Sequence, residues 1–159
     1  MRRVSSSRIL QHLHQGSAPQ AGFPLPFDLV VLCAQERQYS PSVYGHRPFG
    51  ARARVLRVPL TDGGQPLSPQ NAARAYAAGT AVAAALVRDE RVLVTCALGL
   101  NRSGIVNALA MLQLGADAPS AVAIIKRQRP GALHNPHFVQ LVYAVAGRSL
   151  LRIPLTQVA

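Results

Sequence analysis

Several residue types are scarce in this chain, and their scarcity limits what the chain can be. Its 159 residues include two cysteines, no tryptophan and six carboxylates, against 17 basic residues of which all but Lys126 are arginine. Two cysteines are too few for the disulfide framework of a small secreted protein, and no Cys/His cluster has the spacing of zinc ligands. We therefore expect no bound metal, and each cysteine should be either a buried bystander or a reactive group.

Long hydrophobic segments are also missing. The longest apolar run, Ala81–Val87, is too short to span a bilayer, and no apolar stretch follows the basic N-terminus as it would in a secretory signal. The content of 49% hydrophobic and 14% charged residues is that of a folded protein. We expect one domain over 1–159, with a core at about 8–147 and a tail at 148–159, in a cytoplasmic protein without a membrane span.

The chain carries a formal net charge of +11. An arginine-rich proteome would produce such a charge with no bearing on function, whereas an electropositive surface would attract partners that carry phosphate. Nucleic acid is one such partner, but only 5% of the residues are aromatic and no basic run has interleaved aromatics. The charge is therefore compatible with phosphate-bearing partners in general and gives RNA or DNA little specific support.

Hydrophobic patterning predicts alternating strands and helices in the middle of the chain. Continuous apolar runs at 28–33 and 91–96 are typical of strands buried on both faces of a parallel sheet. The predicted strands are 8–13, 28–33, 55–60 and 91–96, the predicted helices 69–88, 103–114, 119–127 and 136–146, and the predicted turns or loops 15–19, 38–50 and 61–66. This order predicts an α/β fold with a mainly parallel central sheet of about four to five strands flanked by helices.

The segment from Cys96 to Arg102 carries the strongest chemical signal. A buried strand ends at Cys96 and Arg102 opens a helix, so the backbone N–H groups between them can turn inward as an anion-binding nest. The same field favours the thiolate of Cys96, which is its nucleophilic form, and the planar fork of Arg102 suits two phosphoryl oxygens. Glycine in the middle tolerates the dihedral angles of a tight loop. The predicted phosphate-binding residues are Ala97, Leu98, Gly99, Leu100, Asn101 and Arg102.

Ser103 adds a further chemical group beside this loop. Its hydroxyl follows Arg102 directly and can donate a hydrogen bond to the Cys96 sulfur. Such a bond would make the sulfur a better leaving group when a phosphoenzyme is hydrolysed. We therefore count Ser103 among the candidate catalytic residues.

The segment TCALGLNRSG resembles the C-x5-R-[ST] signature loop of the protein tyrosine phosphatase superfamily, and its surroundings resemble the dual-specificity branch. ILQHLHQGSAP is similar to the N-terminal strand and turn of that branch, and RQRPGALHNPHFVQLV to its C-terminal region, so the likeness covers roughly Ile9 to Val142. The resemblance implies a protein tyrosine phosphatase-like fold. It also implies hydrolysis of phosphomonoesters through a cysteinyl-phosphate, without metal or other cofactor, in phosphorylated proteins or peptides, with inorganic phosphate or other oxyanions binding at the same loop.

Asp62 is the candidate general acid. The other five carboxylates begin a buried strand, neighbour an arginine, or occupy turns and helix caps, whereas Asp62 lies in a Gly-rich loop after the strand at 55–60. The carboxyl ends of parallel strands gather at one edge of a sheet, which would bring Asp62 near Cys96. An acid in a loop upstream of the cysteine also matches the dual-specificity branch. The alternative, that Asp62 is a plain turn residue, stays open because Asp-Gly favours turns.

Two further positions affect the chemistry. The resembled family usually has histidine before the nucleophile, and this chain has Thr95, which predicts lower activity. Cys33 ends the strand at 28–33, and its surroundings resemble tensin-type lipid phosphatases, in which a cysteine here bonds reversibly to the nucleophile. Cys33 is thus either a redox partner of Cys96 or a small buried hydrophobe.

The sequence is compatible with several classes of substrate. Phosphoproteins, including those with phosphotyrosine, are favoured, whereas phosphoinositides are not, because the loop 97–101 has no lysine. The residues Asn101 to Gly104 are similar to the N-R-[ST]-G ending of RNA 5′-triphosphatase relatives in the same superfamily, so RNA is an alternative substrate. Because Thr95 replaces the usual histidine, a weakly active module that binds phosphorylated partners is a second alternative. His134 and His137 are interpreted as structural or rim residues, and Arg127 and Arg129 as possible residues of the site mouth.

Overall fold

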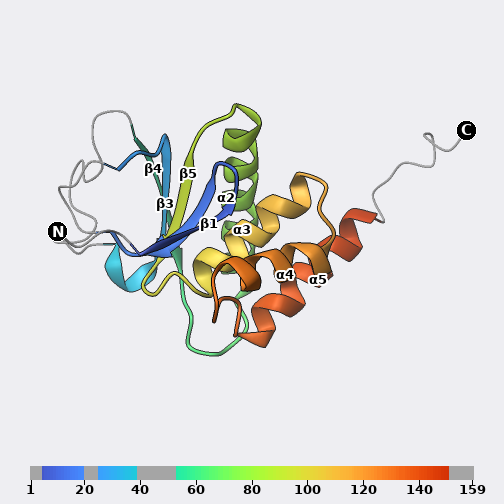
Figure 1. Ribbon diagram of the computed structural model, residues 1–159. Coiled ribbons are helices and arrows are strands. Elements are labelled where there is room, and N and C mark those ends of the chain that lie inside the picture. Colours follow the sequence, from blue (N-terminus) through green and yellow to red (C-terminus); the bar gives the residue numbers. More distant parts are fainter. Residues whose placement is uncertain (1–4, 20–24, 39–52, 151–159) are drawn as a thin grey trace, which may run out of the picture.

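The computed structural model describes residues 5–19, 25–38 and 53–150 (Figure 1). These residues form a five-stranded sheet, a short 3-10 helix and four α-helices. Most of the loop predicted at 38–50, and the tail beyond 150, lie outside the described residues. None of the helices within the described ranges is long and apolar enough to cross a membrane.

The chain begins with a β-hairpin that the sequence did not predict. Strands β1 (Ser6–Leu10) and β2 (Leu13–Ser17) pair antiparallel, so the prediction of one strand at 8–13 and a turn at 15–19 is wrong. Gly16, which suggested the turn, lies inside β2, where a Cβ atom would approach a backbone oxygen just before β1 to 2.8 Å. This glycine permits close packing of two backbones and does not mark a turn.

The remaining strands are parallel and confirm the predicted fold class. They are β3 (Leu29–Ala34), β4 (Arg54–Leu60) and β5 (Val92–Cys96), and the order across the sheet is β1-β2-β5-β3-β4. β5 pairs parallel with β2 and β3, and β3 pairs parallel with β4. The carboxyl ends of these strands therefore meet at one edge of the sheet, and β5 lies centrally with all its residues buried.

The helices follow the predicted positions within a few residues. They are α2 (Pro69–Val87), α3 (Arg102–Gln113), α4 (Ala118–Gln128) and α5 (Pro136–Leu150), and the 3-10 helix η1 covers Gln35–Arg37. Side chains cap two of them, because Ser68 accepts the N–H of Asn71 before α2 and Asp117 accepts the N–H of Ser120 before α4. In Figure 1 these four helices pack on one side of the sheet.

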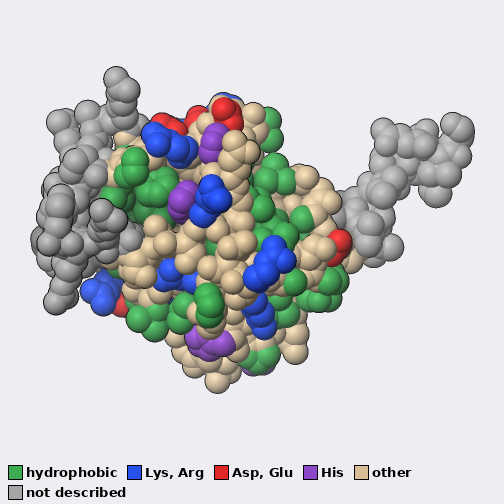
Figure 2. Space-filling model, viewed as in Figure 1, with side chains coloured by type: hydrophobic (Ala, Val, Ile, Leu, Met, Phe, Trp, Pro, Cys, Tyr) green, Lys and Arg blue, Asp and Glu red, His purple; other side chains and the backbone are tan. Residues whose placement is uncertain are grey.

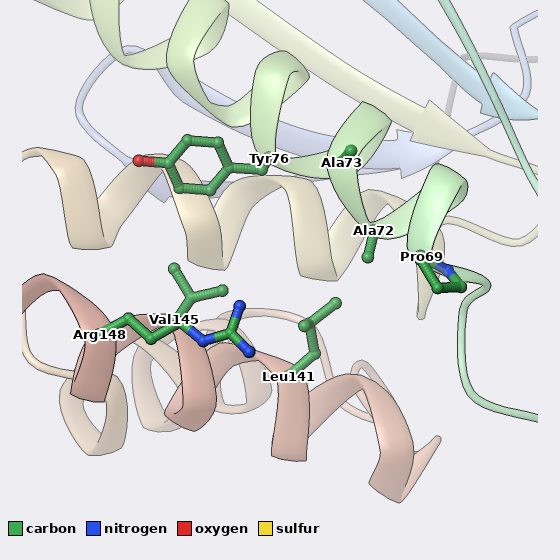
Figure 3. Close-up of a pocket in the computed structure, with 7 residues that line it drawn as sticks. All are labelled: Pro69, Ala72, Ala73, Tyr76, Leu141, Val145 and Arg148. Carbon is green, nitrogen blue, oxygen red and sulfur yellow. The ribbon is translucent and has the colours of Figure 1, made fainter.

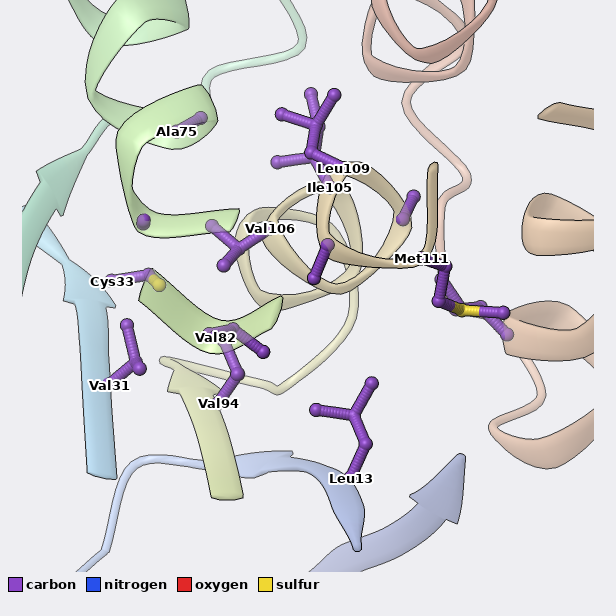
Figure 4. Packing of buried hydrophobic residues seen from close by; sticks show 14 of the residues in the cluster. Leu13, Val31, Cys33, Ala75, Val82, Val94, Ile105, Val106, Leu109 and Met111 are labelled. Carbon is purple, nitrogen blue, oxygen red and sulfur yellow. The ribbon is translucent and has the colours of Figure 1, made fainter. Parts of the chain in front are cut away.

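Helix α3 is the centre of the hydrophobic core. It contacts α2, α4 and α5 as well as β2, β3 and β5. Figure 4 shows side chains of the sheet such as Val31 and Val94 facing side chains of α2 and α3 such as Val82 and Val106. Because α3 begins at Arg102, the packing of this helix fixes the loop that precedes it.

Candidate active site

Three adjacent strand ends bring the chemically active residues together. Cys96 is the last residue of β5 and Asp62 follows β4, as the sequence predicted. Glu36, in η1 after β3, joins them, although the sequence shows it only as a neighbour of Arg37. Glu36 is far from the loop in the sequence, and the pairing of β3 with β5 brings the two together.

The loop 97–101 is held from outside by donors to its carbonyl groups. Arg129 donates to the carbonyls of Leu98 and Gly99, and Gln15 donates to the carbonyls of Gly99 and Leu100, at distances of 2.6 to 3.2 Å. The carbonyl of Ala97 accepts from a backbone N–H at 3.4 Å. Four successive carbonyls thus have partners outside the loop.

The outward carbonyls fix the direction of the loop N–H groups. In a trans peptide the C=O of one residue and the N–H of the next point in opposite directions, and no cis peptide occurs in the described residues. The N–H groups of residues 98–101 therefore point away from Arg129 and Gln15, toward the interior of the loop. Together with the N-terminus of α3 they form an anion-binding nest.

Glycine is required at position 99 for two reasons. Its φ is +72°, in the left-handed region, and a Cβ atom there would lie 2.3 Å from the carbonyl carbon of Gly16. The atom that this Cβ would meet belongs to the backbone of Gly16, so a rotamer change does not relieve the clash. The loop 97–101 is thus seated directly on strand β2.

Gly99→Ala should damage both the loop and its function. The left-handed backbone alone costs about 1–2 kcal/mol, and the clash with Gly16 forces the loop to move, so we expect hydrolysis of an aryl phosphate to fall by roughly 100-fold. Gly115→Ala is the matched control, because Gly115 has φ +98° but nothing lies within 4 Å of its Cβ position. Gly115→Ala should lower the melting temperature and spare the rate. Equal rates in the two variants would contradict the requirement at position 99.

Arg102 is hydrogen-bonded to Glu36 through its terminal nitrogens, whereas its Nε is unpaired among the described residues. Its two terminal nitrogens donate to the Glu36 carboxylate at 2.5 and 2.7 Å, and one of them also donates to the carbonyl of Leu60 at 3.1 Å. Its Nε is buried and has no partner among the described residues. A buried, unpaired charged donor is costly in a folded protein, so an anion at this position would supply the missing acceptor.

The charges of this pair are stable across the usual pH range. Hydrogen bonds from Arg102 lower the pKa of Glu36, although partial burial opposes this. Burial by itself would lower the pKa of Arg102, but the Glu36 hydrogen bonds and the charge of Cys96 raise it overall. Both groups are therefore ionised at neutral pH, and Glu36 fixes the orientation of the guanidinium.

Two hydroxyl groups flank the nucleophile. The Ser103 Oγ lies 3.4 Å from the Cys96 Sγ, close enough for the hydrogen bond that the sequence suggested. The Thr95 Oγ1 is fully buried and donates to the carbonyl of Val31 on β3 at 3.0 Å. Thr95 therefore joins two strands behind the loop and does not donate to the loop itself.

The acid candidate lies against the loop. The Oδ2 of Asp62 accepts from the Asn101 side-chain amide at 2.8 Å, and its Oδ1 accepts from the Asn135 side-chain amide at 3.1 Å. Asn135 precedes α5 and was not singled out from the sequence. The structure also places the guanidinium of Arg129 against the loop carbonyls, behind the nest, which corrects the interpretation of this residue as part of the site mouth.

A separate groove lies between α2 and α5 (Figure 3). It has a volume of about 460 Å³ and is lined by Pro69, Ala72, Ala73, Tyr76, Leu141, Val145 and Arg148. None of these residues belongs to the loop after β5. The groove therefore has no part in the arrangement around Cys96.

Comparison with solved structures identifies the fold. Human DUSP28 matches with a TM-score of 0.71 and 22% identity over 94% of this chain and 97% of its own. The active form of Tk-PTP matches with a TM-score of 0.67 and 19% identity over 91% of this chain and 97% of its own. The chain has the fold of the dual-specificity phosphatases. No family model matches it, and no curated protein matches it.

A third match has a different description. The human tyrosine phosphatase-like serine/threonine/tyrosine-interacting protein matches with a TM-score of 0.73 and 19% identity over 93% of this chain and 99% of its own. The dual-specificity phosphatase fold is thus shared by proteins described as phosphatases and by one described as phosphatase-like. Because these identities are low, the function of the present chain has to be argued from its own residues.

Proposed function

We propose that this chain hydrolyses phosphomonoesters through a cysteinyl-phosphate intermediate, with phosphorylated proteins or peptides as substrates. The observation that carries the proposal is the convergence of donors on Cys96. The inward N–H groups of residues 98–101 and the unpaired, buried Nε of Arg102 surround one position next to a buried thiol. A phosphoryl group supplies the acceptors that these donors lack.

The reaction proceeds in two balanced steps. In the first, the Cys96 thiolate forms an S–P bond, the bond from phosphorus to the leaving oxygen breaks, and Asp62 gives that oxygen its proton. In the second, a water oxygen attacks phosphorus while Asp62 takes its proton, and the S–P bond breaks to return the thiolate. Ser103 donates to the departing sulfur, and the loop N–H groups and Arg102 stabilise the equatorial oxygens in both steps.

The contact of Asn101 removes the sequence feature that suggested RNA, whereas the surface charge does not separate RNA from phosphoproteins. The face shown in Figure 2 carries more basic and histidine side chains than acidic ones, in keeping with the net charge of +11. Such a surface attracts phosphate-bearing substrates of any kind. Asn101, which suggested RNA, directs its side chain to Asp62, so its presence is explained without an RNA substrate.

The test is hydrolysis of p-nitrophenyl phosphate in the presence of a metal chelator, followed by acid quenching and mass spectrometry. We expect steady turnover and a phosphate adduct on the peptide that contains Cys96. An adduct elsewhere would contradict the assignment of the nucleophile. An inactive protein that still binds tungstate would contradict hydrolysis and favour a phospho-binding module, with Thr95 as the first residue to replace by histidine.

Asp62→Asn should lower kcat by about 100- to 10,000-fold, because general acid–base catalysis contributes that range. Asparagine keeps the size of the side chain but carries no proton to give. Asp117→Asn, at the cap of α4, is the control and should keep the wild-type kcat. An Asp62→Asn variant with kcat near the wild-type value would assign the acid to another group.

Two alternatives stay open for Cys33, a redox partner of Cys96 or a small buried hydrophobe, and oxidation distinguishes them. Both thiols are free and buried. The pKa of Cys33 is raised well above its usual value, mainly by burial and to a smaller extent by the charge of Cys96. Peroxide would convert Cys96 to a sulfenic acid, and Cys33 would then displace water to form the disulfide. Because the Cys33 thiolate is scarce at neutral pH, the crosslink should form slowly there and faster in alkali, as mass spectrometry can follow. Absence of the crosslink would leave Cys33 as a core residue.

A further inference from the structure

Two asparagine side chains grip the carboxylate of Asp62. The Asn101 Nδ2 donates to one carboxylate oxygen at 2.8 Å, and the Asn135 Nδ2 donates to the other at 3.1 Å. Asn101 is the last loop residue before Arg102, and Asn135 is the residue before α5. The carboxylate is therefore held from two elements that are both fixed by the core.

Backbone donors determine which way the two amides face. The N–H of Asn135 donates to the Oδ1 of Asn101 at 3.1 Å, and the N–H of His137 donates to the Oδ1 of Asn135 at 3.0 Å. A backbone N–H only donates, so each amide oxygen has to face its N–H and each NH₂ group has to face Asp62. The contact with Asp62 is thus a donation from both sides.

His134 completes the arrangement around Asn101. Its Nδ1 lies 2.9 Å from the carbonyl of Gly131, which only accepts, so Nδ1 carries the proton. The Nε2 of the neutral ring then accepts from the Asn101 Nδ2 at 3.0 Å. Both hydrogens of the Asn101 amide are used, one on Asp62 and one on His134. Its Oδ1 accepts from the Asn135 N–H, and Asn101 makes no side-chain cap for α3, although asparagine favours that role.

The loop that carries Asp62 has few other restraints. Its residues from Gly63 to Pro66 are exposed, and a Cβ atom on either glycine would meet nothing within 4 Å. Beyond the amides on Asp62, the Asn71 side chain donates to Thr61 at 3.3 Å and Asn135 donates to the carbonyl of Gln65 at 3.3 Å. Without the amides, holding the carboxylate over the nest would cost side-chain and backbone entropy.

We propose that Asn101 and Asn135 form a carboxamide clamp that positions Asp62 for proton transfer at the phosphate loop. The inference rests on the proposed function, since it concerns the acid of that reaction. Both asparagines are positioning residues, because they act on the reaction through Asp62. Their contribution should depend on the leaving group, since an ester with a poor leaving group needs the proton more than one with a good leaving group.

The test compares Asn101→Ser and Asn135→Ser on p-nitrophenyl phosphate, which has a good leaving group, and phenyl phosphate, which has a poor one. Serine at position 135 still provides an oxygen to cap α5, so the cap and the clamp are separated. We expect kcat/KM for phenyl phosphate, which reports the step in which the leaving group departs, to fall about tenfold or more beyond any fall for p-nitrophenyl phosphate, because small displacements of a catalytic group are costly. Tungstate affinity of Asn135→Ser should stay within about threefold of the wild type, since residue 135 lies outside the loop whose N–H groups form the nest.

Two comparisons make the result specific. Asn107→Ser removes a buried amide that supports Gln15 behind the loop, with no contact to Asp62, and should lower both rates in parallel. In an Asp62→Asn background, the clamp substitutions should have no further leaving-group effect. Equal losses on the two esters, or no loss, would overturn the clamp while leaving the phosphatase intact. A wild-type protein inactive on both esters would overturn the proposed function, and the clamp with it.

Discussion

Cys96→Ser should abolish turnover of an aryl phosphate, with a loss of roughly 1,000-fold or more in kcat. Serine preserves the size of the side chain and the contact with Ser103, but its hydroxyl is not ionised at neutral pH and attacks phosphorus far more slowly than a thiolate. Steady-state hydrolysis under chelator measures the loss. The mass adduct at position 96 should vanish in the same variant.

Binding separates this loss from a damaged fold. The donors that surround the site are backbone N–H groups and Arg102, none of which Cys96→Ser removes, so tungstate should bind within about tenfold of the wild-type affinity. Cys33→Ala is the matched control, because it truncates the other buried cysteine and should retain most of the activity. Substantial turnover by Cys96→Ser would reject the covalent mechanism.

Arg102→Lys should lower kcat/KM by about 100- to 1,000-fold and should also bind oxyanions much more weakly than the wild type. The guanidinium serves two partners at once, since its terminal nitrogens hold Glu36 and its Nε is left for an anion. An ammonium group is a point charge without this fork, so it satisfies Glu36 or the phosphoryl group but not both in the same geometry. Stopped assays and tungstate titration measure the two losses.

A surface substitution provides the control for charge. Arg88→Lys keeps the net charge and alters an exposed ion pair with Glu90, so rates and melting temperature should stay close to wild type.

Glu36→Gln tests the carboxylate that pairs with the Arg102 guanidinium. It should reduce kcat/KM less than Arg102→Lys does, because the guanidinium remains but loses its charged partner. An Arg102→Lys variant with near-normal kcat/KM would remove this residue from the mechanism.

The sequence predicted the strands that matter for the site and the loop between Cys96 and Arg102. These features are local, because continuous apolar runs, a capped helix and an arginine after a strand-end cysteine can be read within short windows. The predicted sheet and most helix bounds are confirmed on this basis. Asp62 and Cys96 lie at the same sheet edge because parallel strands share a direction, which the sequence pattern also implied.

The supports of the site were not predictable in the same way. Strand order and helix packing bring four supporting residues to the site, and neither can be read from a short stretch of sequence. These residues are Gln15, Glu36, Arg129 and Asn135. Gly16 shows how a local rule misleads, since glycine suggested a turn although close contact between backbones required it. Gln15, Arg129 and Asn135 are polar residues at buried positions, where packing alone would favour apolar side chains, whereas Glu36 is exposed and offers no such signal.

The seating of the loop on the first hairpin has a consequence for how the molecule folds. Gln15 and Gly99 are joined by a hydrogen bond across 84 positions of sequence, and the Arg129–Ser7 contact spans 122. Contacts of such long range form late and slow the search for the native state. The loop at Cys96 therefore lacks its supports until the first hairpin and Arg129 have docked against it. Loss of catalytic activity should then coincide with global unfolding, which makes enzymatic rate a direct measure of cooperativity in this fold.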